Sequence, residues 1–337
     1  MKVLVTGCSG FIGFHLSCLL LKKKIGVIGV DNLNNYYDVK LKKNRINFFK
    51  KNFKNFQFLK VDLSNKKELI RVFKKNSFTK VINLAAQAGV RYSLINPDAY
   101  VKSNLVGFCN LIELSKDFKV KHFVYASTSS VYGMNTKQPL TESDNVDHPI
   151  QFYAATKRSN ELISHAYSHI YNLPTTGLRF FTVYGPWGRP DMALFLFTKN
   201  ILSKKPIKVF NYGNHTRDFT YIDDIAKSVF NISKKIPIKK NFKKKRYLPF
   251  ESSAPFRILN IGNSKPINLM KYIKEIEQKL KLNAKKKYLP LQVGDIKSTL
   301  SDTKKLKQLV NHKPNTSVRY GIGKFIDWYL KYYNVKK

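Results

Sequence analysis

The sequence predicts an α/β fold in which a doubly wound parallel sheet is followed by a smaller C-terminal α/β cap. Gly7, Gly10 and Gly13 follow the first apolar segment at a spacing typical of a strand that turns tightly into a helix. Strand-like apolar segments then alternate with helical segments, which indicates parallel strands covered by helices on both faces. From about residue 182 this regular alternation stops, so the cap is expected to begin there.

The first element is a buried strand over residues 2–6, and the glycine turn leads from it into a helix that extends to about residue 23. Such glycines let the backbone approach a pyrophosphate, and the helix N-terminus offers free N–H groups to the phosphates. A glycine turn without a ligand is the alternative, but both flanking elements are present. The turn therefore predicts a Rossmann-type dinucleotide site with the candidate residues Gly7, Gly10, Phe11, Ile12 and Gly13.

A second strand, over residues 25–30, leads directly to Asp31. A carboxylate at this point accepts hydrogen bonds from the ribose hydroxyls of an adenosine and repels a 2′-phosphate, which favours NAD over NADP. A turn aspartate without a ligand is the alternative. We expect Asp31 and its neighbour Asn32 to bind the cofactor.

Further alternating segments continue the sheet. The expected strands cover residues 56–61, 80–84, 121–126 and 175–180, and the expected helices end near residue 75 and span about 98–116. Small residues after the fourth strand would let the chain pass close under the nicotinamide-side ribose and phosphate. These segments add the cofactor candidates Asp62, Leu63, Ala85, Ala86, Gln87 and Asn104.

Tyr153 and Lys157 are four residues apart in a predicted helix, so both side chains lie on one face. If that face meets a bound nicotinamide, the lysine ammonium lowers the pKa of the tyrosine and lets the phenol exchange protons near neutral pH. The pattern is common by chance, so its meaning depends on the dinucleotide site. Thr128 and Ser129 follow the fifth strand, at the edge where parallel sheets bind ligands.

The C-terminal part is predicted to form a smaller mixed cap. Its expected elements are a helix to about residue 203, a strand over 207–210, a segment over 217–221 that leads into a helix, an exposed loop over 236–256, a strand over 257–261, and helices near 268–280 and 318–332. We expect residues 1–181 to form the NAD-binding domain, with some later segments returning to it. Residues 182–337 would mainly form the cap that binds the substrate.

The chain carries 61 Lys and Arg residues against 21 Asp and Glu, a net charge of +40. A nucleic-acid binder is one interpretation, but no helix-turn-helix, zinc-finger or aromatic RNA-binding pattern accompanies the charge. Lysines scattered over solvated faces are the preferred interpretation, so no specific nucleic-acid partner is expected.

The cysteine count and the hydropathy bear on location. Three cysteines without a Cys-x-x-Cys pair predict neither a disulfide framework nor a zinc site, and no metal ligand is expected. No apolar stretch is long enough for a membrane span. The first residues are predicted to form a strand rather than a signal peptide. We therefore expect a cytoplasmic protein.

Four longer motifs are more specific than any of these patterns. They are AQAGVRYS at 86–93, YAATK at 153–157, LRFFTVYGPWGRPDMA at 178–193 and RDFTYIDD at 217–224. With the glycine turn and Thr128, they resemble the extended short-chain dehydrogenase/reductase family, and within it the nucleotide-sugar 4-epimerases, most closely the UDP-glucuronate 4-epimerases. The resemblance extends from the first residue to about residue 333.

This resemblance implies an isomerase that uses bound NAD to convert UDP-glucuronate to UDP-galacturonate through a 4-keto intermediate. Tyr153 would take the proton from the sugar 4-hydroxyl, Lys157 would bind the nicotinamide ribose, and Thr128 would hydrogen-bond the same sugar oxygen. A hydride would leave C4 and return after the keto sugar has swung about its pyrophosphate link. Related dehydratases carry Asp-Glu after the threonine. Ser129 and Ser130 stand there in this chain, which favours hydride transfer alone.

The resemblance also implies substrate contacts. Arg217 would bind the diphosphate, Phe210 would pack on the uracil, and Asp295 would contact the uridine ribose, although Gln292 replaces the second arginine expected nearby. Thr182 and Arg189 would hold the sugar carboxylate and so protect the β-keto acid intermediate from loss of CO₂. A turn arginine without a ligand is the alternative for Arg189. The full set of substrate candidates is Arg91, Ser93, Ser129, Thr182, Arg189, Val209, Phe210, Arg217 and Asp295.

Several alternatives stay open. One is a 4-epimerase of another UDP-sugar, namely UDP-N-acetylglucosamine, its uronate or UDP-glucose, and another is a UDP-glucuronate decarboxylase. A non-catalytic NAD-sensing or nucleic-acid-binding protein is disfavoured because Thr128, Tyr153 and Lys157 are all present. The resemblance further implies a homodimer through a four-helix bundle of the helices near 98–116 and 152–170, and a role in polysaccharide biosynthesis.

Overall fold

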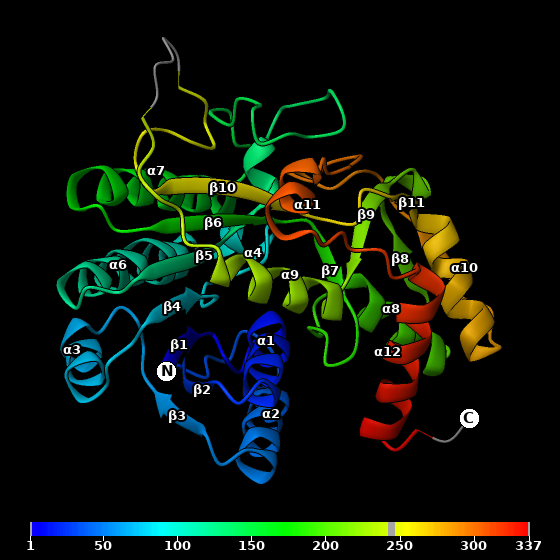
Figure 1. Ribbon diagram of the computed structural model, residues 1–337. Coiled ribbons are helices and arrows are strands. Elements are labelled where there is room, and N and C mark those ends of the chain that lie inside the picture. Colours follow the sequence, from blue (N-terminus) through cyan, green and yellow to red (C-terminus); the bar gives the residue numbers. More distant parts are fainter. Residues whose placement is uncertain (1, 242–246, 336–337) are drawn as a thin grey trace.

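The computed structural model describes residues 2–241 and 247–335. Its centre is a seven-stranded sheet with the strand order β10-β6-β5-β4-β1-β2-β3, in which every pairing is parallel (Figure 1). The direction of the order reverses between β1 and β4, and such a point of reversal opens a crevice at the carboxyl ends of the strands. The strands are β1 Lys2–Thr6, β2 Gly26–Asp31, β3 Phe56–Lys60, β4 Lys80–Asn83, β5 His122–Thr128, β6 Thr175–Phe180 and β10 Phe256–Ile261.

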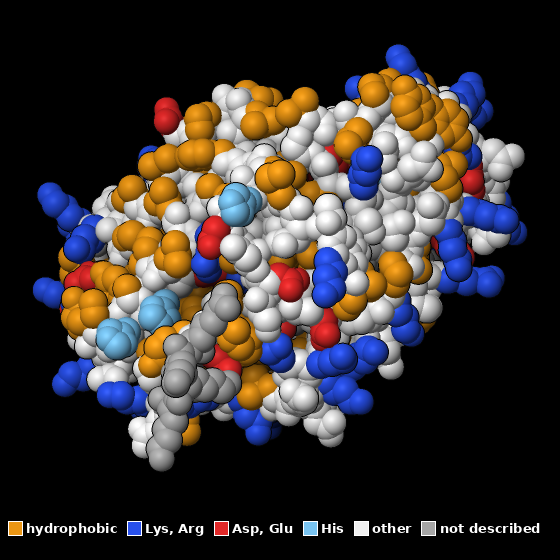
Figure 2. All heavy atoms as spheres, turned by 90° about the horizontal axis from the view of Figure 1, so that it is seen from above, with side chains coloured by type: hydrophobic (Ala, Val, Ile, Leu, Met, Phe, Trp, Pro, Cys, Tyr) orange, Lys and Arg blue, Asp and Glu red, His pale blue; other side chains and the backbone are white. Residues whose placement is uncertain are grey.

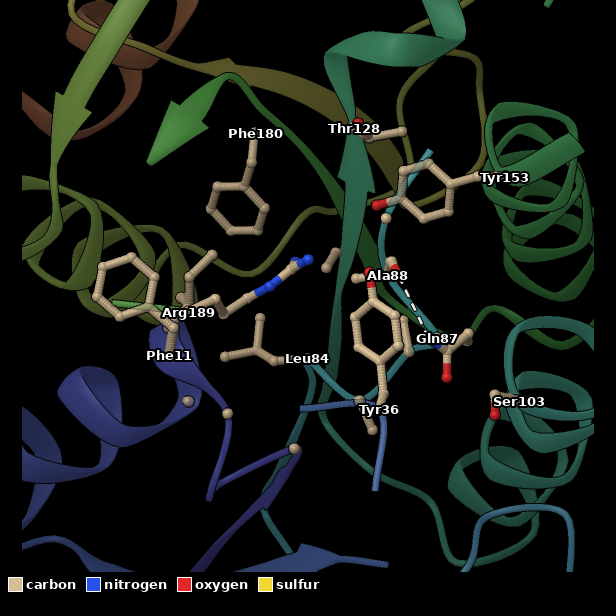
Figure 3. Close-up of a pocket in the computed structure, with 18 of the residues that line it drawn as sticks. Phe11, Tyr36, Leu84, Gln87, Ala88, Ser103, Thr128, Tyr153, Phe180 and Arg189 are labelled. Atoms are coloured by element: carbon tan, nitrogen blue, oxygen red, sulfur yellow. Dashed lines mark hydrogen bonds between the residues drawn. The ribbon is translucent and has the colours of Figure 1, made fainter. Parts of the chain in front are cut away.

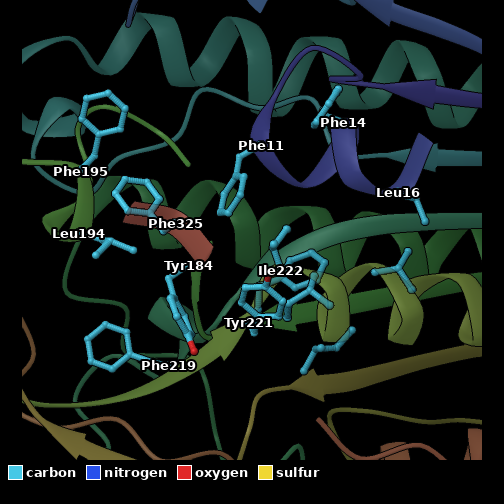
Figure 4. Packing of buried hydrophobic residues seen from close by; sticks show 14 of the residues in the cluster. Phe11, Phe14, Leu16, Tyr184, Leu194, Phe195, Phe219, Tyr221, Ile222 and Phe325 are labelled. Carbon is cyan, nitrogen blue, oxygen red and sulfur yellow. The ribbon is translucent and has the colours of Figure 1, made fainter. Parts of the chain in front are cut away.

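Helices cover both faces of this sheet because alternate residues of each strand point to opposite sides. Val3 and Val5 of β1 belong to one buried cluster, and Leu4 belongs to another. The first cluster lies under α1 and α9, where Phe11 points toward Ile222 (Figure 4). The second lies under α3, α6 and α7. The bounds are α1 Phe11–Lys22, α2 Val39–Asn52, α3 Lys66–Lys75, α6 Gly107–Asp117, α7 Phe152–Tyr171 and α9 Ile222–Lys234.

The helix expected over about 98–116 is present, but its middle part is a π-helix. The structure has short helices α4 Tyr92–Ile95 and α5 Pro97–Tyr100, then a π-helix over Val101–Val106, and then α6. A π-helix has a wider turn than an α-helix and shifts the side chains that follow it. Its Asn104 side chain accepts a hydrogen bond from the Gln87 backbone N–H and donates one to the Gln87 carbonyl, at 2.8 and 3.1 Å. These bonds to the loop after β4 compensate for the irregular backbone.

Apart from β10 and α9, which belong to the central sheet and the layer on it, the chain from residue 182 onward forms two small sheets with helices around them. One sheet has the order β11-β9-β7, with β7 parallel and β11 antiparallel to β9, and the other pairs β8 with β12. The strands are β7 Thr182–Tyr184, β8 Ile207–Val209, β9 Thr216–Tyr221, β11 Pro266–Asn268 and β12 Lys286–Tyr288. The helices are α8 Ala193–Leu202, α10 Leu269–Leu280, α11 Lys304–Val310 and α12 Val318–Tyr332.

The loop expected over 236–256 is only partly exposed. Residues 242–246 lie outside the described residues. After them, Phe250 and Ala254 are buried in the cluster under α7, because the chain folds back through short bridges before it enters β10. Among the helices that the structure describes, none combines the length and the apolar character that crossing a membrane requires.

Candidate active site

A cavity of about 410 Å³ lies at the carboxyl ends of the central strands, where the order of the sheet reverses. Its walls come from the loops after β1, β2, β4 and β5, from α7, and from the turn that precedes α8 (Figure 3). The cavity brings together most of the residues predicted from the sequence. Those that line it are Gly7, Gly10, Phe11, Ile12, Gly13, Asp31, Asn32, Asp62, Leu63, Ala85, Ala86, Gln87, Thr128, Ser129, Tyr153, Lys157, Thr182 and Arg189.

The glycine turn brings the start of α1 close to the ends of β1 and β4. Gly7 has a φ of +68°, a conformation that other residues rarely adopt, and a Cβ on Gly7 would lie 2.7 Å from the backbone nitrogen of Ala85. A Cβ on Gly13 would overlap the carbonyl oxygen of Gly7. The first turn of α1 therefore packs directly on the turn after β1. Residues 10–13 line the cavity, so the N-terminus of a helix, which can bind phosphate, stands at its wall.

The end of β2 forms the second part of the cofactor region. Asp31 accepts hydrogen bonds from the backbone N–H groups of Ser9 and Leu33 at 3.3 and 2.9 Å, which fix its carboxylate at the cavity wall. Asn32 donates to Asp62 at 3.1 Å. Burial opposes the ionisation of Asp62, but hydrogen bonds from Ser64 and Asn32 hold its pKa below the ordinary value. Two carboxylates thus stand at this end of the cavity.

Lys42 lines the same region and was not predicted. Its ammonium group donates to the backbone and side-chain oxygens of Asn34, each at 2.6 Å, and lies 4.4 Å from the centre of the Tyr37 ring. Burial lowers the pKa of Lys42 to about 8, and the charge of Asp31 opposes this shift. Nothing in the sequence separates Lys42 from the other lysines, because its burial depends on how α2 packs.

Tyr153 and Thr128 meet at the opposite end of the cavity, where the tyrosine hydroxyl points toward Thr128 (Figure 3). Burial raises the pKa of Tyr153, and the charge of Arg189 and a hydrogen bond with Thr128 oppose the rise. Arg189, and not Lys157, is thus the cation that opposes the effect of burial on the pKa of Tyr153. Lys157 itself is 2% exposed, and burial lowers its pKa to about 8 while the charge of Glu161 opposes the shift.

Arg189 reaches into the cavity from the turn before α8 (Figure 3). Its Nε and Nη2 donate to the two carboxylate oxygens of Asp191 at 3.0 and 2.5 Å. The hydroxyl of Tyr36 donates to the same carboxylate at 3.1 Å, so the loop after β2 and the turn before α8 are tied together across the cavity. Tyr36 and Asp191 were not predicted as site residues, since only the folded chain brings them to Arg189.

The remaining substrate candidates lie outside the lining of this cavity. Arg217 donates to Asp295 at 2.9 Å, and the Arg91 guanidinium lies 5.1 Å from the centre of the Phe210 ring, which follows buried Val209 at the end of β8. These pairs bring together residues that are far apart in the sequence. His215, which was not predicted, lies 3.6 Å from Asp295.

Two of the predicted binding residues lie behind the cavity wall. Ser93 is buried and donates to the carbonyl of Val90 at 2.6 Å, so it stabilises the turn that leads into α4. Asn104 is also buried and lies behind the loop after β4, where its amide binds the backbone of Gln87 and the hydroxyl of Thr156. Both side chains shape the wall from behind and do not line the cavity.

On the face shown in Figure 2, Lys and Arg side chains are scattered among hydrophobic and other polar side chains. The described residues hold no group of three or more His, Cys, Asp or Glu side chains that could bind a metal ion. All three cysteines are free, and Cys8 is buried.

Comparisons with known proteins agree with this geometry. Residues 3–242 match the model of the NAD dependent epimerase/dehydratase family. The chain is 51% identical to Protein CapI of Staphylococcus aureus, over 99% of each chain, and 43% identical to a probable UDP-glucuronate 4-epimerase of Rhizobium meliloti, over 99% of this chain and 98% of that one. The structure of UDP-glucuronic acid 4-epimerase from Bacillus cereus in complex with UDP-glucuronic acid and NAD is similar, with a TM-score of 0.87 and 32% identity over 99% of this chain and 100% of that chain.

Proposed function

The chain belongs to the NAD dependent epimerase/dehydratase family. From its similarity to UDP-glucuronate 4-epimerases and from the residues of the cavity, we infer that it is an isomerase that converts UDP-glucuronate to UDP-galacturonate. The observation that carries the proposal is the placement of Tyr153, Thr128 and Arg189 in one cavity. The first two supply proton chemistry at a sugar hydroxyl, and the third supplies a cation for a carboxylate.

The cavity fits NAD as the cofactor. The glycine turn, the N-terminus of α1 and Asp31 would hold the pyrophosphate and the adenosine ribose, and Lys157 would hold the nicotinamide ribose. When bound there, NAD would supply a group that can accept the hydride from sugar C4 and give it back.

The side chains of this protein would handle the proton and the orientation of the sugar. Tyr153 takes the proton from the 4-hydroxyl group as a base and returns it after the 4-keto sugar has turned its other face. Thr128 hydrogen-bonds the same oxygen, and Thr182 and Arg189 hold the carboxylate. Since Ser129 and Ser130 follow Thr128, no carboxyl group stands beside the threonine to remove water. Reversible oxidation at C4 is therefore the chemistry that the site supports best.

Replacement of Arg189 by alanine tests the substrate. We expect the wild type to convert UDP-glucuronate to UDP-galacturonate without consuming added NAD, and Arg189→Ala to lose about 10- to 100-fold in kcat/KM, since charged hydrogen bonds contribute about 1.5–3 kcal/mol. Both enzymes would be assayed by chromatography on UDP-glucuronate, UDP-glucose and UDP-N-acetylglucosamine. Equal losses on all three sugars would contradict a carboxylate anchor, and a UDP-pentose as the sole product would indicate a decarboxylase.

We also propose a homodimer formed by a four-helix bundle of α7, the π-helix and α6 from each copy. Val106, Leu162 and Ile170 on these helices are 46%, 56% and 64% exposed, which leaves apolar surface for a partner. Sedimentation equilibrium should give about twice the chain mass of 39.0 kDa for the wild type and the chain mass for Leu162→Glu. Ile238→Glu, at a 72% exposed site in a loop, is the matched control. A wild type that sediments as a monomer would refute the bundle.

We further propose that residues 1–181 chiefly hold the cofactor and that residues 182–337 chiefly hold the nucleotide sugar. The positions of the glycine turn and of the Arg217–Asp295 pair support this division. A cytoplasmic location is consistent with the three free cysteines. UDP-galacturonate would serve as a precursor in polysaccharide biosynthesis.

A further inference from the structure

Arg45 of α2 is a buried cation that no carboxylate of the described residues neutralises through an ion pair. Its side chain is 0% exposed, and its hydrogen-bond acceptors are two backbone carbonyls and one phenol. Its Nε atom is buried and has no hydrogen-bond partner within the described part of the chain. A buried charge without a counter-ion is costly, so a neutral side chain would fill this space at a lower cost. The contacts of Arg45 therefore indicate what its guanidinium is used for.

The guanidinium joins the cofactor region to the turn before α8, which spans residues 185–192. Nη1 of Arg45 donates to the Ser9 carbonyl at 2.6 Å and to the Tyr37 hydroxyl at 3.0 Å. Nη2 donates to the Trp187 carbonyl at 2.5 Å. Ser9 belongs to the glycine turn, and Tyr37 lines the cavity in the loop after β2. One planar group with several fixed donors thus holds three segments that meet only in the folded chain.

The Trp187 backbone needs this support. Its φ is +59°, in the left-handed region that residues other than glycine rarely adopt. Its ring lies 5.1 Å from the ring of Phe14 on α1 and 5.1 Å from the ring of Tyr332 on α12, measured between ring centres. The Trp187 carbonyl lies in the plane of the peptide bond that follows. Its hydrogen bond to Arg45 therefore fixes the direction in which the chain continues toward Arg189.

This direction matters because one edge of the Arg189 guanidinium is already occupied. Its Nε and Nη2 atoms each donate one hydrogen bond to Asp191, and its central carbon lies 5.9 Å from the centre of the Tyr36 ring. A guanidinium carries five N–H donors, so both donors of Nη1 and one of Nη2 are left for a ligand. A carboxylate binds such an edge through two parallel hydrogen bonds, which require one orientation of the arginine.

We propose that Arg45 is a positioning residue that aims Arg189 at the sugar carboxylate through the Trp187 carbonyl and ties this anchor to the glycine turn. The proposal rests on the proposed function, in which Arg189 binds the carboxylate of UDP-glucuronate. An arginine that only stabilised the fold would affect the binding of every nucleotide sugar alike. UDP-glucose carries a hydroxymethyl group in place of the carboxylate, so the preference between the two sugars distinguishes the two roles.

The test measures this preference in full-length variants with NAD in excess. All variants carry Tyr153→Phe, so that the sugars should bind without conversion, and isothermal titration gives Kd for each sugar. Arg45→Lys keeps the charge but replaces the fork of donors by one ammonium group, which cannot hold Ser9 and Trp187 in the same way. The preference for UDP-glucuronate should fall by about 3- to 10-fold, because a side chain that is no longer held must be ordered on binding. Affinity for UDP-glucose should stay within about twofold.

A double-mutant cycle with Arg189→Ala shows whether Arg45 acts through Arg189. On the Arg189→Ala protein, Arg45→Lys should leave the preference unchanged, because the group that it positions is gone. Arg257→Lys is the matched control. Arg257 of β10 also donates to a backbone carbonyl, that of Lys235, but it lies outside the lining of the cavity. This control should keep the preference of the parent protein.

Hydrogen exchange of residues 185–192 gives a measurement that does not involve the sugar. The Met192 N–H donates to the Arg189 carbonyl at 3.1 Å, so its exchange reports on the order of the turn. This N–H should exchange about tenfold faster in Arg45→Lys, since the turn opens more readily once its tether is lost. If Arg45→Lys does not fold, Tyr37→Phe removes only the hydroxyl that holds Nη1 of Arg45 and should also speed the exchange.

The outcomes separate this proposal from the proposed function. A folded Arg45→Lys variant with an unchanged preference, or with equal losses on both sugars, would refute the positioning role. Effects of Arg45→Lys and Arg189→Ala that simply add would also contradict it. If the parent protein binds both sugars equally well, Arg189 is no carboxylate anchor and the proposed function fails. The exchange of residues 185–192 then still decides whether Arg45 fixes the turn, and an unchanged rate would show that it does not.

Discussion

Replacing Tyr153 with phenylalanine is expected to lower kcat on UDP-glucuronate by about 10³-fold or more, since a positioned acid–base group contributes about 10²–10⁴-fold. The change removes only the hydroxyl that points toward Thr128 (Figure 3). The Tyr153 ring, which packs edge-on against Tyr100 with 5.9 Å between the ring centres, stays in place. The variant should therefore keep its fold and its bound NAD, as measured by circular dichroism and by the NAD content of the purified protein.

Tyr171→Phe provides the matched control for this prediction. Tyr171 ends the same helix and is 49% exposed, so the loss of its hydroxyl should leave kcat within about twofold of the wild type. A Tyr153→Phe variant that keeps more than a tenth of the wild-type kcat would show that another group takes the proton.

Gly13→Ala is expected to abolish tight NAD binding and to destabilise the fold by about 1–3 kcal/mol, the usual cost of overpacking. The new Cβ would overlap the Gly7 carbonyl oxygen. Neither atom can be moved away by a change of side-chain rotamer, because both positions are fixed by the backbone. The helix must then move from the turn after β1, which displaces the N–H groups that would bind the phosphates. NAD content and chemical unfolding measure the two effects.

Gly323→Ala provides a contrast at another helical glycine. Its nearest neighbour would be a side-chain carbon of Lys279 at 3.9 Å, which is an ordinary contact. Because alanine favours the helix more than glycine does, α12 should be unchanged or more stable by up to about 1 kcal/mol. Equal effects of the two substitutions would contradict the close packing at Gly13.

Much of the fold could be predicted because its signals are local. The strand over 175–180 and the helix over 318–332 were predicted with the observed bounds, since strongly apolar periodic segments reveal their own ends. Helix α2 was not predicted because Lys, Asn and Arg interrupt its apolar positions. Asn104 forms long-range hydrogen bonds in the π-helix, which no local pattern reveals.

In the candidate site, too, some residues could be predicted from local sequence signals and others could not. The residues of the glycine turn and the Tyr153–Lys157 pair follow from spacing along one element, and the structure places them in one cavity. Tyr36, Lys42 and Arg45 depend on contacts that form only in the folded chain. Their sequence neighbourhoods contain many similar polar residues, so only the packing of the chain selects them.

The edge strand β10 affects how this enzyme can be divided. It comes from residues 256–261, after the two small sheets have begun, and pairs with β6 along its whole length. A fragment that stops near residue 181 would lack β10 and also α9, which packs against α1. It would expose a strand edge and the apolar side of the first helix, both of which favour aggregation. Recombination between relatives should therefore preserve function when it exchanges surface loops, and should fail at a single crossover near residue 181, which separates β6 from β10 and α1 from α9.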